Sequence, residues 1–170
     1  MSAAKDSEPN PTKHRTTVEP KAECEIVVTR IFDAPPRIVF QAWTTPSLFR
    51  RWWVPKSMPL PLLSYEADIR TGGGYRLVFG VDETKTMAFF GTYIEVTPYS
   101  RIVWTNDESG EDGAITTVTL EEKGDKTLQV LHERYRSKEV RDAALASGAY
   151  EGMGETFGQL DEELVALQRC

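Results

Sequence analysis

Polar and apolar residues alternate through the middle of the chain, which is the pattern of strands that bury one face. The first such segment covers residues 24–32, where β-branched residues are frequent. After residue 62 the alternation resumes and is interrupted by turn signals such as Gly72-Gly73-Gly74 and Lys123-Gly124-Asp125. The pattern predicts six further strands, over residues 63–70, 75–80, 87–97, 102–106, 114–122 and 127–135.

Helical patterns lie between the first two strands and in the C-terminal third. Asp33, a candidate N-cap followed by Pro35, signals one start, and Thr45-Pro46 signals another. Ser137 is a candidate N-cap for a short third helix. From Tyr150 onward, apolar residues recur at steps of four and three, which predicts a long amphipathic helix. Its apolar face is Met153, Phe157, Leu160, Leu164 and Leu167.

The order of these elements indicates an α+β domain with an antiparallel sheet of about six or seven strands. Long antiparallel strands curve, and one helix cannot cover a curved sheet completely, so we expect a cavity between helix and sheet. A single domain is predicted over residues 23–170. Residues 1–22 are polar and contain three prolines, and we predict that they form a disordered tail.

Composition and charge narrow the functional classes. The chain of 170 residues is 40% hydrophobic and 27% charged, as in ordinary globular proteins. Its net charge of -6 argues against a nucleic-acid-binding protein, which usually presents a basic face. No segment reaches the roughly 18 apolar residues of a membrane span, and the N-terminus lacks the apolar stretch of a signal peptide. A cytoplasmic location is therefore expected.

Cysteine and histidine give no sign of a metal site. Cys24 and Cys170 are the two cysteines, and their spacing fits no metal or redox motif. A disulfide between them stays open, although a cytoplasmic location disfavours it. His132-Glu133 begins a zinc-protease motif, but Arg136 stands where the second histidine is required. The other histidine, His14, lies in the predicted tail, so we predict no metal site and no cofactor.

Several short runs form an ordered set of motifs: Arg30-Ile31-Phe32-Asp33-Ala34-Pro35, Phe40-Gln41-Ala42-Trp43-Thr44, Trp52-Trp53-Val54-Pro55, Asp68-Ile69-Arg70-Thr71-Gly72-Gly73, Gly91-Thr92-Tyr93-Ile94-Glu95-Val96 and Ser137-Lys138-Glu139-Val140-Arg141-Asp142. In this order they resemble the activator-of-Hsp90-ATPase homologue domain of the START/Bet v 1-like superfamily. The resemblance covers residues 23–168 and implies a helix-grip fold, in which a curved antiparallel sheet grips the C-terminal helix over a hydrophobic pocket. Relatives usually carry glycine where Val54 stands here, and tend to be apolar at the positions of Gln129 and Glu133.

A pocket of this kind is mostly apolar and aromatic, which directs attention to the large apolar residues. The alternative for each of them is ordinary packing in the core. The predicted ligand-binding residues are Trp43, Trp52, Trp53, Phe79, Tyr93, Trp104, Gln129, Leu131, Glu133, Met153 and Phe157.

Glu133 is the single residue with the most chemical interest. Strand alternation places it on one face with Gln129, Leu131 and Tyr135. We predict that this face points into the space between sheet and helix, where a carboxylate could orient a ligand or act as an acid or base. The alternative is an outward strand face with an ordinary surface carboxylate.

Gly154 and Gly158 lie within the last predicted helix, where each glycine costs about 1 kcal/mol relative to alanine. We expect a compensating reason, either close approach of helix and sheet or space left for a ligand. Gly72-Gly73-Gly74 is predicted to be a turn between two strands and not a phosphate-binding loop, which would join a strand to a helix.

The sequence as a whole favours a domain that binds a small hydrophobic or aromatic molecule. Two alternatives remain: an enzyme of the polyketide-cyclase or small-hydrolase kind on the same scaffold, and a co-chaperone acting on Hsp90. No catalytic residue is assigned, because few polar groups are expected to converge in the pocket. The ligand and the oligomeric state do not follow from the sequence.

Overall fold

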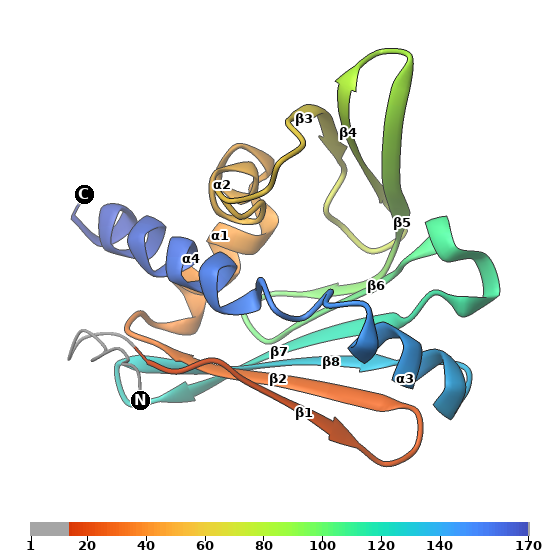
Figure 1. Cartoon of the computed structure of the whole chain (residues 1–170). Coiled ribbons are helices and arrows are strands. Elements are labelled where there is room, and N and C mark those ends of the chain that lie inside the picture. Colours follow the sequence, from red (N-terminus) through yellow and green to blue (C-terminus); the bar gives the residue numbers. More distant parts are fainter. Residues whose placement is uncertain (1–13, 170) are drawn as a thin grey trace, which may run out of the picture.

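The protein is an α+β structure built on one curved antiparallel sheet, and a computed structural model describes residues 14–169 (Figure 1). The strands are β1 (Thr17–Lys21), β2 (Glu25–Phe32), β3 (Leu62–Ala67), β4 (Gly74–Asp82), β5 (Lys85–Thr97), β6 (Arg101–Thr105), β7 (Ile115–Lys123) and β8 (Lys126–Arg134). The helices are α1 (Pro36–Thr44), α2 (Pro46–Trp52), α3 (Lys138–Ala146) and α4 (Met153–Gln168), with a short 3-10 helix at Asp107–Asp112. This is the predicted helix-grip architecture.

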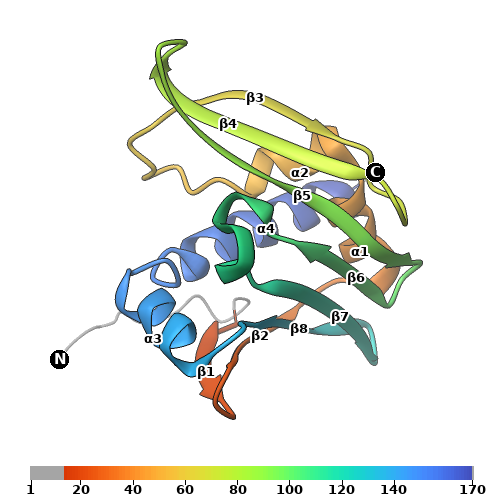
Figure 2. The same ribbon diagram turned by 90° about the vertical axis from the view of Figure 1, so that its right-hand side faces the viewer.

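The strand order explains how the sheet surrounds the helices. The eight strands lie in the order β1-β2-β8-β7-β6-β5-β4-β3, so β3 to β8 form a continuous meander and β2 joins its far edge. The register pairs Phe32 with Thr127 and Val28 with Leu131. Figure 2 shows α2 and α4 between the β3–β5 part of the sheet and the part formed by β1, β2 and β8. The helices therefore occupy the concave side of a strongly bent sheet.

The prediction of a disordered tail over residues 1–22 is wrong for residues 17–21, which form strand β1. This strand pairs with β2 from Thr17 opposite Thr29 to Lys21 opposite Glu25. It is an edge strand and most of its side chains are exposed, so it carries no alternation of buried and exposed residues. Its proline, Pro20, is tolerated because edge positions do not all need an amide donor. Residues 1–13 and Cys170 lie outside the described residues, and Cys24 is a free cysteine.

The helix starts agree with the sequence signals at Thr45 and Ser137, whereas α4 begins at Met153, three residues after the predicted start at Tyr150, and the signal at Asp33 fails. Ser137 accepts a hydrogen bond from the Val140 amide at 3.1 Å, as expected of an N-cap. Helix α1 instead begins after Pro35, without a side-chain cap, so the prediction of Asp33 as the N-cap is wrong. The Asp33 carboxylate contacts Lys126 and His14 instead of the backbone amides at the start of α1.

Helix α4 buries the predicted apolar face. Phe157, Leu160 and Leu164 are buried, and Met153 is partly buried at the first turn. The Phe157 ring meets the Phe32 ring of β2 edge-on, with centroids 5.8 Å apart. The described residues include no helix long and apolar enough to cross a membrane.

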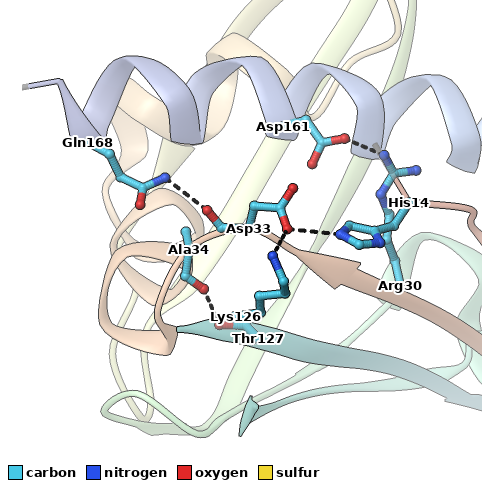
Figure 3. Close-up of polar contacts among 8 residues, drawn as sticks. All are labelled: His14, Arg30, Asp33, Ala34, Lys126, Thr127, Asp161 and Gln168. Carbon is cyan, nitrogen blue, oxygen red and sulfur yellow. Dashed lines mark hydrogen bonds and ion pairs between the residues drawn. The ribbon is translucent and has the colours of Figure 1, made fainter. Parts of the chain in front are cut away.

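Polar contacts fasten the C-terminal half of α4 to β2 and β8 (Figure 3). Asp161 of α4 pairs with Arg30 of β2, whose side chain is only 5% exposed. Asp33 accepts from Lys126 at 2.7 Å and contacts His14 at 2.9 Å. Gln168 donates to the Asp33 carbonyl at 3.1 Å. We refer to this region, comprising His14, Arg30, Asp33, Lys126, Asp161 and Gln168, as the closed end.

The Gly72-Gly73-Gly74 segment is the predicted turn between two strands. Gly72 adopts a positive φ of 90°, a conformation that favours glycine. A Cβ on Gly73 would lie 2.0 Å from the Asp68 carbonyl oxygen, so no larger residue fits there without a shift. The Gly72 amide donates to the Tyr93 carbonyl at 2.8 Å, and the Tyr93 amide donates to the Gly73 carbonyl at 2.8 Å. The turn thus fixes Tyr93 on β5.

Candidate ligand-binding cavity

A cavity of about 480 Å³ lies at the opposite end of α4 from the closed end. Strands β3 to β6 provide one side, and α2, the loop after it and the first turn of α4 provide the other. This volume is within the usual range for small-molecule sites, about 300–1,000 Å³. The lining residues are Trp43, Phe49, Trp53, Val54, Pro55, Met58, Tyr65, Tyr75, Leu77, Phe79, Phe89, Tyr93, Ile102, Trp104, Asn106, Gly148, Ala149, Gly152, Met153 and Thr156.

Aromatic rings in mutual contact form much of this lining. Trp43 has its ring centroid 5.7 Å from that of Trp104 and 5.7 Å from that of Trp53. Phe49 stacks on Trp53 at 5.1 Å. Such contacts hold large apolar side chains in fixed orientations, so the cavity presents broad aromatic faces to its interior.

The predicted ligand-binding residues divide into two groups. The first group lines the cavity and comprises Trp43, Trp53, Phe79, Tyr93, Trp104 and Met153. The second group lies outside the lining and comprises Trp52, Gln129, Leu131, Glu133 and Phe157. The residues of the second group therefore make no direct contact with the interior of the cavity.

Trp52, Leu131 and Phe157 are part of the hydrophobic core. All three side chains are 0% exposed. The Trp52 indole donates to the Ala42 carbonyl at 3.1 Å and its ring meets that of Trp43 at 4.8 Å. Trp52 thus supports a lining residue from behind. All three residues pack in the core, which is the alternative that the sequence left open for each of them.

Gln129 also acts from behind the lining. Its side chain is fully buried on the inner face of β8, and its carbonyl oxygen accepts a hydrogen bond of 2.8 Å from the Trp43 indole. This bond fixes the plane of an indole that lines the cavity. The Gln129 amide nitrogen is buried and has no hydrogen-bond partner within residues 14–169.

Glu133 points to the inner face of the sheet, as the alternation predicted, and lies at the centre of a polar cluster. Its carboxylate accepts a hydrogen bond of 2.8 Å from Thr116 and one of 3.3 Å from Tyr135. Tyr150, in the loop before α4, donates to the same carboxylate, and the Tyr135 and Tyr150 hydroxyls are 2.7 Å apart. Burial, together with the negative charge of Glu133, raises the pKa of Tyr150. The cluster therefore holds the α3–α4 loop against the sheet with Tyr150 neutral.

A chain of hydrogen bonds connects this cluster to the lining. Asn106 donates to the Thr116 hydroxyl at 2.9 Å, and its amide oxygen accepts from Tyr75 at 3.4 Å. The Tyr75 hydroxyl also donates to the Thr105 carbonyl at 2.8 Å. Both Asn106 and Tyr75 line the cavity, so Glu133 reaches it only through other residues.

Gln159 of α4 fixes the loop that follows α2. Its amide nitrogen donates to the carbonyls of Trp52 and Val54, each at 2.9 Å. Its amide oxygen accepts from the backbone amide of Lys56 at 2.8 Å. These bonds hold Val54 and Pro55 against the cavity.

The two glycines inside α4, Gly154 and Gly158, do not have the surroundings that the sequence predicted. A Cβ on Gly154 or Gly158 would meet nothing within 4 Å, so the predicted close approach of helix and sheet at these glycines is wrong. Neither glycine lines the cavity, and nothing in the structure explains them. In the described part of the chain, no group of three or more His, Cys, Asp or Glu residues could hold a metal ion.

The sequence reasoning missed part of the lining, including Phe49, Tyr65, Tyr75, Leu77 and Asn106. Alternation with Phe79 along β4 was the signal for Tyr75 and Leu77, which share its face. No local pattern distinguishes Asn106 or the loop residues Val54 and Met58. Their position depends on how the loops return to the sheet.

Comparisons with known proteins agree with this architecture. A model of the family described as Activator of Hsp90 ATPase homolog 1-like protein matches residues 33–165. A crystal structure of a protein from Rhodobacter sphaeroides is 25% identical, with a TM-score of 0.79, and covers 90% of this chain and 99% of its own. Proteins from Nitrosomonas europaea (24% identical, TM-score 0.75, 88% and 99% covered) and Mycobacterium smegmatis (22%, 0.74, 90% and 99%) share the fold. No curated protein matches the sequence.

Proposed function

The chain belongs to the Activator of Hsp90 ATPase homolog 1-like family, and from this and the cavity we propose that it binds a small apolar or aromatic molecule. The observation that carries the proposal is the cavity of about 480 Å³ beneath β3 to β6, lined mainly by aromatic and aliphatic side chains. A ligand filling such a space removes apolar surface from water, worth about 25 cal/mol per Å². The side chains are already ordered by contacts from behind, so little entropy is lost on binding.

Diphenylmethane, an apolar probe with two rings, tests this proposal. Because three lining residues are tryptophans, its binding should change the intrinsic fluorescence of the protein. Binding to the folded state alone also raises the midpoint of thermal unfolding with probe concentration, by mass action. Native mass spectrometry of freshly purified protein would report a ligand that co-purifies.

Matched variants locate the probe. Leu77→Trp adds bulk to a lining residue of β4 and should weaken diphenylmethane binding by about tenfold or more. Val81→Trp makes a comparable change on the same strand, at a side chain that is 71% exposed, and should leave binding unchanged. Equal affinities for the two variants, or no binding to the unaltered protein, would contradict the proposal.

An enzyme is the second candidate, favoured by the cluster of Glu133, Tyr135 and Tyr150 and its hydrogen-bonded connection to Tyr75. It has less support because three donors already occupy the Glu133 carboxylate and Glu133 is outside the lining. Hydrolysis of p-nitrophenyl butyrate above the rate in buffer, abolished by Glu133→Gln, would favour the enzyme. Equal rates for both proteins and for buffer would exclude this reaction.

A further inference from the structure

The side-chain amide of Asn106 has a fixed orientation at the wall of the cavity. Its nitrogen donates to the Ala114 carbonyl at 2.8 Å and to the Thr116 hydroxyl at 2.9 Å. The carbonyl can only accept, and Thr116 donates its own proton to Glu133 at 2.8 Å, so both neighbours of the amide need a donor. A reversed amide would place its oxygen against two acceptors. The Asn106 oxygen therefore faces away from β7, on the side of the lining residue Tyr75.

This oxygen has no well-placed donor within residues 14–169. The Tyr75 hydroxyl lies within reach of two acceptors, the Thr105 carbonyl at 2.8 Å and the Asn106 oxygen at 3.4 Å. A phenol carries a single proton, and the shorter contact holds it. The Asn106 oxygen is thus an acceptor at the wall of the cavity whose nearest donor is committed elsewhere.

A ligand that fills the cavity must replace whatever water meets this oxygen. An apolar group placed against the Asn106 oxygen would leave it without a partner, which lowers affinity. An O–H or N–H group at the same point would take over the hydrogen bond of the water. The polar atom of the wall therefore favours a ligand that carries a donor.

The charges around this wall favour a donor as well. Burial raises the pKa of Tyr75. The negative charges of Glu108, Asp107 and Glu133 raise this pKa further. A negative potential of this kind attracts the positive end of an O–H or N–H bond and repels a carboxylate or a carbonyl oxygen. The charges and the Asn106 oxygen thus select the same polarity.

The other two phenols of the lining do not determine the class of ligand. The Tyr65 hydroxyl is buried without a hydrogen-bond partner within the described residues, and it lies too deep to meet a ligand. The positive charge of Arg50 acts on this phenol, which belongs to β3. The Tyr93 hydroxyl can donate or accept, so either kind of ligand group satisfies it. The Asn106 oxygen can only accept.

We infer that the ligand carries, on its apolar or aromatic body, a hydroxyl or N–H group that donates a hydrogen bond to the side-chain oxygen of Asn106. This inference rests on the proposed function, because it specifies the chemistry of the molecule in the same cavity. Thr116 is then a positioning residue, since it holds the amide in the orientation that accepts. The Glu133 carboxylate acts on the ligand through Thr116 and Asn106, without touching it.

Three probes with the same two rings test the class of ligand. The first, para-benzylphenol, carries a hydroxyl donor, and para-benzyltoluene replaces the hydroxyl with a methyl group of similar size. Benzophenone offers an acceptor and no donor. Isothermal titration calorimetry gives their affinities for the unaltered protein and its variants. The phenol should bind at least about fivefold more tightly than benzophenone.

Two substitutions in the lining test the role of Asn106. Asn106→Leu removes the acceptor with little change in size and should lower the affinity for para-benzylphenol about five- to tenfold relative to that for para-benzyltoluene. Comparing the change for each probe cancels the difference in hydrophobicity between them. Tyr93→Phe is the control, because it removes a hydroxyl from the same lining and should leave the ratio of the two affinities unchanged.

A third substitution acts from behind the lining. Thr116 is 0% exposed and lies outside the lining, and Thr116→Val keeps its shape without the hydroxyl. The Asn106 amide then retains only its bond to Ala114, so its orientation is less fixed. The affinity for para-benzylphenol should fall about two- to threefold relative to that for para-benzyltoluene. Circular dichroism without ligand shows that each variant folds, and Thr116→Val is the deciding variant if Asn106→Leu does not.

The possible results separate the two proposals. An affinity ratio that stays unchanged in Asn106→Leu, or in Thr116→Val where Asn106→Leu does not fold, shows that the inference is wrong while binding in the cavity stands. A ratio that changes in Tyr93→Phe and not in Asn106→Leu, or tighter binding of benzophenone than of para-benzylphenol, would also overturn it. If none of the three probes binds, both the inference and the proposed function fail.

Discussion

The two ends of α4 meet the sheet in different ways. At the closed end, Asp161 pairs with a nearly buried Arg30 and Gln168 bonds to the chain before α1. At the other end, Met153 and Thr156 face an open volume of about 480 Å³. Helix α4 therefore contacts the sheet and the chain before α1 through its C-terminal half and borders the cavity at its first turn. The closed end supplies the packing that allows the cavity end to remain incompletely filled.

This difference shows where polar groups are used. At the closed end they join α4 to the strands directly (Figure 3). Around the cavity they act from outside the lining, where Gln129 orients Trp43 and Gln159 holds the loop at Val54. The lining of the cavity is thereby left mainly apolar, with no charged side chain in it.

The largest effect should come from truncating the buried residue of α4 that lies one turn beyond the cavity. Phe157→Ala removes a fully buried ring and should lower the free energy of unfolding by about 4 kcal/mol, the usual cost of a large core cavity. Met153→Ala, one turn earlier, enlarges a space that already exists and should cost about 1 kcal/mol. Urea denaturation followed by circular dichroism measures both. Equal losses would show that α4 is packed as tightly beside the cavity as it is one turn further along.

Breaking the pair at the closed end should have the next largest effect. Asp161→Leu leaves the Arg30 charge buried without its carboxylate and should cost about 3 kcal/mol. Burial raises the pKa of Asp161, although the positive charge of Arg30 opposes the shift. Asp161→Asn removes the same charge but keeps an oxygen acceptor for Arg30, so it should cost less than Asp161→Leu.

The double variant Arg30→Met/Asp161→Leu is the control for this pair. It removes both charges and should recover most of the stability that Asp161→Leu loses. A double variant as unstable as Asp161→Leu, measured by the same urea denaturation, would show that packing and not the buried charge is responsible.

The loop between α3 and α4, which lies at the cavity end of α4, should respond more modestly. Tyr150→Phe removes a hydrogen bond to Glu133 and should cost about 1–2 kcal/mol. Hydrogen exchange should become faster in residues 147–152, which include the lining residues Gly148, Ala149 and Gly152. Tyr99→Phe is the matched control, because Tyr99 is 52% exposed. Unchanged exchange in the loop would show that this bond does not hold it.

The smallest effect should come from Asp33. Burial opposes its ionisation, but hydrogen bonds from Lys126 and His14 outweigh this and hold its pKa below the ordinary value. A lowered pKa contributes stability above the ordinary value, about pH 4, and that stability is lost as the pH falls through the folded-state pKa. Because the contacts are partly exposed, the contribution should be below about 1 kcal/mol. Asp33→Asn should lower stability at pH 7 and converge with the unaltered protein in acid, as measured by denaturation across pH.

The sequence predicts the fold better than it predicts the cavity, for reasons visible at particular residues. Alternation suffices to group Gln129 and Glu133 on one face of β8, but the contacts of the folded structure are needed to identify that face as the inner one. Helical periodicity suffices to predict that Phe157 and Leu160 are buried. Strand β1 could not be predicted, because an exposed edge strand shows no alternation of buried and exposed residues. Whether Trp52 or Trp53 touches the cavity depends on the rotation of a short helix that buries both sides of its end.

Polar partners are harder still to predict from the sequence. Tyr65 and Tyr75 lie on neighbouring strands, β3 and β4, and no local pattern around either residue predicts a hydrogen-bond partner. The partners of Tyr75 are Thr105 and Asn106, about thirty residues later, and their position follows from the bend of the sheet. The unpaired hydroxyl of Tyr65 is therefore a property of the folded structure alone.

The strand order also has a consequence for how the chain folds. Strands β3 to β8 each pair with the next in sequence, so every contact of the meander closes a short loop. Strand β2 must instead find β8, bringing Glu25 beside Arg134 across most of the chain. Long-range pairing of this kind is slow, because chain entropy is lost before the contacts form. We expect the meander to gain protection first in a refolding experiment with pulsed hydrogen exchange, with the β1–β2 hairpin docking last.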